Sequence, residues 1–219
     1  MSESTAQVQS VVRIANANRV PVWASSQGRN NGYGGPSARV IGSVLICLKK
    51  MNRILEITTE LAYAVVEPGV RWFDLYDALH AEGDELLVSV RDIGWGSVVG
   101  NSLDNGITFM PAGSDFSAQC GMVVVLADGS LLRTGMGAQE GNESWHTYKR
   151  GLGPVLDPLF IRSNYGIVTR MGIWLRSGRK RMHRSTFPFR VTTSSIELST
   201  SSASFVLPAF SGACPTFRT

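Results

Sequence analysis

The chain has 219 residues, of which 43% are hydrophobic, and a formal net charge of +4. This composition is that of a globular protein with a substantial core and excludes a disordered chain. No apolar run approaches the roughly 20 residues that a membrane helix needs, and the start MSESTAQVQS lacks the basic and apolar regions of a secretory signal, so we expect an intracellular, cytoplasmic protein. Cys47, Cys120 and Cys214 are odd in number and far apart, which disfavours a disulfide framework and a C-x-x-C metal site and indicates reduced thiols.

The first 83 residues are predicted to form two helices and four strands. Apolar residues at helical spacing predict a helix over residues 5–17, with Ser4 or Thr5 as its N-cap. The same spacing predicts a second helix over residues 71–83, which stops at Gly83. Runs rich in β-branched residues predict strands at 20–25, 43–48, 51–58 and 62–69.

The clearest element of the second half is a hairpin over residues 120–135, whose two strands are joined by Asp128-Gly129. The other predicted elements are a short helix from Gly96 to Leu103 that opens at Ser97, a helix over 153–163 that is broken or started at Pro158, and a strand over 165–175. The alternation of helices and strands predicts an α+β fold in which helices flank mixed sheets.

The positive charge is concentrated in RSGRKRMHR, residues 176–184. Such a cluster can bind phosphate backbones, but a solvated linker is the commoner explanation, so a nucleic-acid partner is disfavoured. The following serine and threonine tract and the last residues, 185–219, show no clear periodicity and are expected to be irregular.

Two segments are dense in glycine. SQGRNNGYGG, residues 26–35, directly follows the strand VPVWAS, and GWGSVVGNSLDNG covers residues 94–106. Glycine permits positive φ and close approach of a ligand, so successive N–H groups can converge on an anion. Neither the G-x-x-x-x-G-K-[ST] motif nor a complete G-x-G-x-x-G motif is present, and a surface Gly/Asn turn remains the alternative for the first segment. Two such loops suit a long ligand with a diphosphate at its centre.

The residues around these loops resemble a known family. PVWASSQGRNNGYGGPSARVIGSVLICLKKMNRILEI is similar to the diphosphate-binding segment of the vanillyl-alcohol oxidase and 4-cresol dehydrogenase (p-cresol methylhydroxylase) flavoproteins. The resemblance continues, in the same order, through AYAVVEPGV, RDIGWGSVVGN, CGMVVVLADGSLLRTGMGA and SNYGIVTRMGIWL, and covers roughly residues 5–176.

The resemblance implies FAD as cofactor, held by a two-subdomain FAD-binding domain of the p-cresol methylhydroxylase type. This domain would span residues 1–178, with a first subdomain of about 1–58 and a second of about 59–178, followed by a basic linker and Ser/Thr-rich irregular tail at 179–219. Compared with the family pattern, we expect the domain to be N-terminally incomplete and to lack the substrate cap domain.

The matching positions also imply which residues hold the cofactor. The diphosphate would be wrapped by the backbone N–H groups of Ser26, Gln27, Gly28, Arg29, Asn30, Asn31 and Gly32. The second side of the cofactor would be lined by Gly96, Ser97, Gly100 and Asn101, with the short helix directed at phosphate. Gly166, Ile167 and Val168 match the segment that meets the adenine end, although plain strand core explains Ile167 and Val168 equally well.

The resemblance further implies oxidation of a para-substituted phenol by hydride transfer to flavin N5, with oxygen or a redox protein as electron acceptor. Asp92 matches the carboxylate beside the flavin, and Tyr33 matches a tyrosine that hydrogen-bonds the phenolate oxygen; a turn residue and a loop cover are the alternatives. No metal site is expected, and an oligomer is compatible with the sequence. The competing hypothesis is a catalytically inactive fragment, or an FAD- or phosphate-binding module without turnover.

Overall fold

The computed structural model describes residues 1–29, 35–83, 86–88, 94–106, 115–151, 153–177, 182–186 and 204–208. Within these ranges the α-helices are α1 (Thr5–Ala17), α2 (Trp72–Ala81) and α3 (Val98–Leu103). The strands there are β1 (Val22–Ser25), β2 (Val44–Cys47), β3 (Ile54–Thr58), β4 (Tyr63–Val66), β5 (Leu86–Leu87), β6 (Gln119–Leu126), β7 (Leu131–Arg133), β8 (Gly166–Trp174), β9 (Arg176–Ser177), β10 (Met182–Thr186) and β11 (Ser204–Pro208). Short 3₁₀ turns cover Asp115–Ala118, Gly135–Ala138 and Asp157–Phe160.

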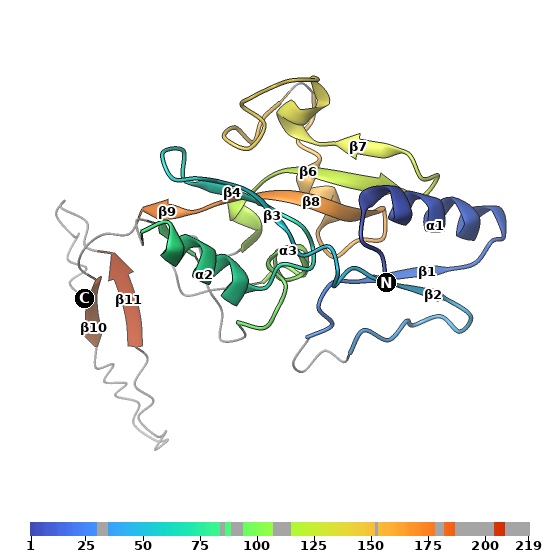
Figure 1. Cartoon of the computed structure of the whole chain (residues 1–219), viewed down its shortest axis with the longest axis horizontal. Helices are drawn as coiled ribbons and strands as arrows, with labels where there is room; N and C mark the ends of the chain where they lie inside the picture. The colour runs from blue at the N-terminus through green and yellow to red at the C-terminus, as the bar shows by residue number, and fades with distance from the viewer. Residues whose placement is uncertain are drawn as a thin grey trace, which may run out of the picture.

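A five-stranded sheet forms the centre of the molecule (Figure 1). Its strand order is β3-β4-β8-β6-β7, and each neighbouring pair is antiparallel. β6 and β8 are the longest strands and lie side by side in the middle of the sheet. β6 is buried along almost its whole length, which its apolar residues 122–126 favour.

The two faces of this sheet are covered by different helices. Val124 and Val168 share one apolar cluster with side chains of α2 and α3. Their neighbours Val125 and Ile167 pack instead with a second cluster, built from α1, β2 and the residues that follow β2. Because side chains alternate along a strand, one pair of adjacent strands anchors both layers. α1 and α3 are therefore held at fixed positions on opposite faces of the sheet.

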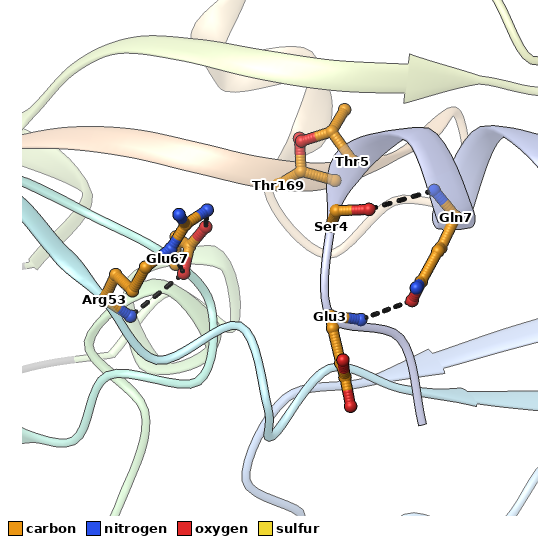
Figure 2. A network of polar contacts seen from close by, with 7 residues as sticks. All are labelled: Glu3, Ser4, Thr5, Gln7, Arg53, Glu67 and Thr169. Atoms are coloured by element: carbon orange, nitrogen blue, oxygen red, sulfur yellow. Dashed lines mark hydrogen bonds and ion pairs between the residues drawn. The ribbon is translucent and has the colours of Figure 1, made fainter.

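Helix α1 has the bounds that its sequence predicts. The Ser4 hydroxyl accepts a hydrogen bond from the Gln7 N–H at 3.3 Å and so acts as the N-cap (Figure 2). Val8, Val12 and Ala15, which lie on one helical face, are buried. The predicted hairpin is also confirmed, since β6 and β7 pair antiparallel around Gly129, whose φ is +79°.

The strands before residue 60 divide between two sheets. β1 and β2 form a separate parallel pair beneath α1 (Figure 1). β3 pairs with β4 in the central sheet, so the chain passes into that sheet at β3. The boundary between the two subdomains at about residue 58 remains a prediction.

Two expectations differ from the structure. The helix predicted over residues 153–163 is wrong, because only the 3₁₀ turn Asp157–Phe160 forms there. Gly153 has a φ of +84°, and the prolines at 154 and 158 lack the N–H that an α-helix would use. Within the segment that we expected to be irregular, β10 and β11 pair antiparallel. A ladder of backbone hydrogen bonds needs no apolar periodicity, so this pairing left no clear signal in the sequence.

The described cysteines, Cys47 and Cys120, are free thiols, as expected. Burial raises the pKa of Cys120 to about 12, so this thiol stays protonated and unreactive near neutral pH. Cys214 lies outside the described residues. None of the helices within the described ranges has the length and apolarity to cross a bilayer.

The start of α2 depends on an ion pair between Arg71 and Asp74. The Asp74 carboxylate accepts a hydrogen bond from the Arg71 backbone N–H at 2.9 Å and also pairs with the Arg71 guanidinium. This pairing holds the pKa of Asp74 below its usual value. The carboxylate therefore satisfies an N-terminal backbone donor while it is ionised.

We expect Asp74→Asn to lower the free energy of unfolding by about 1 kcal/mol at pH 7, because α2 loses a charged acceptor at its N-terminus. Since the folded-state pKa is lowered, the contribution of Asp74 is complete above the ordinary aspartate pKa of about 3.9 and is lost as the pH falls through the lowered value. Urea unfolding at pH 7 and at about pH 2.5 measures this, and the deficit should be smaller at the lower pH. Glu60→Gln, at an exposed position outside α2, is the control; a deficit of Asp74→Asn that is as large in acid as at pH 7 would contradict the role of the ion pair.

Candidate functional site

The first glycine loop begins where β1 ends. β1 is fixed by its pairing with β2, which continues with a hydrogen bond from the Leu48 N–H to the Ser25 carbonyl at 2.8 Å. Gly28 has a φ of +63°, a conformation that favours glycine, and a Cβ there would lie 3.1 Å from the Cβ of Pro36. The loop therefore turns sharply after Gln27, and its far side returns against Gly28.

Several N–H groups of this loop are available to a ligand. In the described part of the chain, the backbone N–H groups of Gln27, Gly28 and Arg29 donate no hydrogen bond to another protein group. Consecutive unpaired N–H groups around a left-handed residue form a concave site that suits an anion. This geometry fits the phosphate-binding chemistry that the sequence predicts.

The second loop leads into α3, and its predicted helix is confirmed. Ser97 is the N-cap, since its hydroxyl accepts a hydrogen bond from the Gly100 N–H at 2.9 Å. The Trp72 N–H donates to the Gly96 carbonyl at 3.1 Å, which holds the loop against the start of α2. Asn101 lies in the first turn of α3, where its N–H donates to the Ser97 carbonyl at 2.9 Å.

The two loops meet at Ser26 and Gly100. A Cβ added at Gly100 would overlap the Ser26 hydroxyl and would lie 3.4 Å from the Ser26 Cβ. The absence of a side chain at Gly100 therefore allows the first loop to approach α3 closely. Two segments that are far apart in the sequence thus form one site.

A short turn, residues 67–70, lies between the two loops, and we call it the central turn. The Val70 N–H donates to the Glu67 carbonyl at 3.1 Å, which closes the turn. The Gln27 side-chain amide donates to the Gly69 carbonyl at 2.5 Å, and the Ser97 hydroxyl donates to the Pro68 carbonyl at 2.6 Å. Our sequence analysis treated Pro-Gly only as the end of a strand and missed this role.

A buried carboxylate anchors the central turn to the start of β3. Glu67 is 3% exposed, and its carboxylate accepts hydrogen bonds from the Arg53 backbone N–H at 2.9 Å and from the Arg53 guanidinium at 2.8 Å (Figure 2). These contacts raise the pKa of Arg53. A buried charge that is paired and hydrogen-bonded in this way fixes the turn, because any displacement would leave the carboxylate unsatisfied.

The residues predicted to meet the adenine end lie on β8. Val168 belongs to the apolar cluster that includes Val98 and Val99 of α3, so its side chain is strand core on the α3 face of the sheet. Ile167 packs on the opposite face. A Cβ at Gly166 would lie 3.0 Å from the Val125 carbonyl, so close packing of β8 against β6 explains this glycine. Backbone contacts between these residues and a ligand remain a prediction.

Some predicted site residues lie outside the described ranges. They are the loop residues Asn30, Asn31 and Gly32 and both residues predicted to act in catalysis, Tyr33 and Asp92. Arg29 is described and exposed. Among the predicted site residues that the structure describes, it brings Ser26, Gln27 and Gly28 together with Ser97 and Gly100 around the central turn.

Comparison with known proteins gives several matches. The family model described as "FAD binding domain" matches residues 1–135. The flavoprotein subunit of 4-cresol dehydrogenase [hydroxylating] from Pseudomonas putida is 45% identical over 170 residues, which are 77% of this chain and 33% of that protein. 1'-Carboxy-chondrochloren decarboxylase from Chondromyces crocatus is 41% identical over 86% of this chain and 35% of its own length.

Solved structures show a similar fold. 4-Ethylphenol oxidase from Gulosibacter chungangensis superposes with a TM-score of 0.80 and 49% identity, over 82% of this chain and 35% of that one. p-Cresol methylhydroxylase with bound substrate also gives a TM-score of 0.80, with 42% identity over 83% of this chain and 35% of that one. The chain thus spans about a third of the length of each of these relatives.

Proposed function

The chain belongs to the family of FAD-binding domains, and from this premise we propose that it holds FAD between the first glycine loop and α3 and forms the cofactor-binding part of an oxidoreductase that acts on para-substituted phenols. The family assignment and the superpositions confirm the cofactor, the resemblance and the fold class expected from the sequence. The residue roles, the substrate and the electron acceptor belong to the proposal.

The observation that carries the proposal is the convergence of the two loops. The N–H groups of Gln27, Gly28 and Arg29 are unpaired within the described residues. Ser26, at the start of the same loop, lies against Gly100 of α3. A diphosphate offers several anionic oxygens that could accept from such a row of donors. The loop residues would bind this group, while the central turn would keep them at the required distance from α3.

Bound FAD supplies the hydride acceptor, so the protein need only bind and orient the substrate and manage its protons. Asp92 would then serve as the base or as a stabilising charge, and Tyr33 would hold the phenolate oxygen. Phenols are the proposed substrates because the names of three relatives specify 4-cresol, 4-ethylphenol and p-cresol. Oxygen or a redox protein is the proposed electron acceptor.

We expect the folded chain to bind FAD saturably, because the described residues of the two loops, 26–29 and 94–106, already lie against the central turn and against each other. A fluorescence titration, in which the flavin emission is quenched on binding, measures this, and circular dichroism of the same sample verifies that the chain is folded. A folded chain that fails to quench flavin fluorescence would contradict the proposed cofactor site. Heat-unfolded chain is the control for nonspecific quenching.

The loaded chain should then be tested with 4-alkylphenols. Reduction of the bound flavin under anaerobic conditions would support phenol oxidation by this part of the protein alone. FAD binding without any reduction would favour the alternative, an FAD-binding module without turnover.

A further inference from the structure

Three consecutive carbonyl oxygens of the central turn accept hydrogen bonds from the two glycine loops. The Pro68 carbonyl accepts from the Ser97 hydroxyl at 2.6 Å, and the Val70 carbonyl accepts from the Val98 N–H at 3.0 Å. Between them, the Gly69 carbonyl accepts from the Gln27 amide at 2.5 Å. The turn is thus bonded to the first loop through its middle carbonyl and to the second loop through the two outer ones.

The central turn itself is firmly held. The Gly69 N–H donates to the Met51 carbonyl at 2.6 Å, and the Glu67 N–H donates to the Arg53 carbonyl at 3.1 Å. The buried Glu67 carboxylate adds hydrogen bonds to Arg53. A segment with this many buried hydrogen bonds moves little, so it can serve as a fixed reference for both loops.

Within the described residues, the first loop is bonded directly to the central turn through the Gln27 side chain, whose amide donates to the Gly69 carbonyl. The neighbouring backbone N–H groups are unpaired there and so do not fix the loop. In the second loop, Ser97 is 4% exposed, and its hydroxyl both donates to Pro68 and accepts from Gly100. Each side chain therefore helps to hold the backbone of its own loop against the central turn.

We propose that Gln27 and Ser97 are positioning residues, whose side chains clamp the two glycine loops to the central turn and so set the width of the FAD diphosphate site. The inference rests on the proposed function and assigns the Gln27 side chain to the protein, while its backbone N–H serves the cofactor. The clamp preorganises the site before the cofactor binds, so its loss reduces the fraction of molecules that are ready to bind.

The chain offers a matched control for each residue. The Gln9 amide donates to the Gly129 carbonyl at 2.7 Å, the same kind of bond as that of Gln27, but at the hairpin turn. Ser4 caps α1 by accepting from the Gln7 N–H, as Ser97 caps α3. The pairs Gln27→Met with Gln9→Met, and Ser97→Ala with Ser4→Ala, therefore separate loop positioning from the general loss of a hydrogen bond.

The experiment measures the dissociation constant and the association rate of FAD, by flavin fluorescence after rapid mixing, together with the thermal unfolding midpoint of each unliganded variant. We expect Gln27→Met and Ser97→Ala to raise the dissociation constant about fivefold to tenfold, mainly through slower association. Gln9→Met and Ser4→Ala should bind FAD as the wild type does. The unfolding midpoints of Gln27→Met and Gln9→Met should fall by similar amounts, while that of Ser97→Ala should fall further than that of Ser4→Ala, because the buried Ser97 hydroxyl makes two hydrogen bonds.

The outcomes distinguish the inference from the function on which it rests. Absence of FAD binding by the folded wild type would overturn the proposed function. If the wild type binds and Gln27→Met binds equally tightly, the clamp alone is overturned. Equal losses of affinity in Gln27→Met and Gln9→Met would also overturn it, because both variants would then act through stability. Recovery of affinity in Ser97→Thr, which keeps the hydroxyl, would support the clamp.

Discussion

Gly69→Ala is expected to lower the free energy of unfolding by about 3 kcal/mol, the upper end of the usual cost of overpacking a buried site. A Cβ at Gly69 would lie 2.5 Å from the Lys49 carbonyl, 2.6 Å from the Met51 carbonyl and 2.9 Å from the Leu48 carbonyl. All three atoms belong to the backbone, so no side-chain rotation can relieve the overlap. The central turn must therefore move away from the segment that follows β2, and the Gly69 N–H loses its bond to Met51.

Urea unfolding of the unliganded variant measures this loss. Gly35→Ala is the control, because nothing lies within 4 Å of a Cβ at that position and its φ is not in the left-handed region. The control should change the free energy of unfolding by no more than about 0.5 kcal/mol. A Gly69→Ala variant as stable as this control would show that the segments around the central turn separate easily, and the central turn could not then serve as a fixed reference for the glycine loops.

The elements that the sequence predicted well depend on local signals. α1 begins after Ser4 because the Ser4 hydroxyl accepts a hydrogen bond from the Gln7 N–H. A serine just before an amphipathic segment can be recognised from the local sequence alone. The hairpin turn behaves in the same way, since the Asp128 side chain accepts from the Ser130 N–H at 2.8 Å and Gly129 takes a positive φ. The helix predicted over 153–163, broken or started at Pro158, does not form, because Pro154 and Pro158 lack the N–H groups that an α-helix would use there.

The site was predicted only in part, because its geometry depends on contacts between distant residues. Glycine content located both loops, but no local signal showed that Ser26 would lie against Gly100. The bond from Gln27 to Gly69 spans 42 residues, and periodicity carries no information about such a pairing. One signal was available: Glu67 is an acidic residue at the end of an apolar strand, and a buried carboxylate requires a partner. The roles of Tyr33 and Asp92 still rest on resemblance alone.

The second large effect concerns the cofactor: Gly100→Ala should weaken FAD binding about 10-fold to 100-fold while the chain stays folded. The added Cβ would overlap the Ser26 hydroxyl, so the Ser26 side chain must rotate away from α3, and the new methyl group would project into the space that we propose for the diphosphate. Within a helix, alanine is favoured over glycine by about 1 kcal/mol, so the variant should be no less stable than the wild type. Affinity and stability are thus expected to change in opposite directions, which a general unfolding effect cannot produce.

Ser102→Ala provides the control for this measurement, because Ser102 lies on the same short helix and is fully buried. Its hydroxyl has no hydrogen-bond partner within the described structure, so its removal costs no bond and should leave the FAD dissociation constant unchanged. Flavin fluorescence titrations of both variants, with circular dichroism to verify folding, complete the test. If Gly100→Ala binds FAD as tightly as Ser102→Ala does, the diphosphate cannot lie between α3 and the first loop. The N–H groups of Gln27, Gly28 and Arg29, which are unpaired within the described residues, would then have to serve a ligand that approaches from the side away from α3.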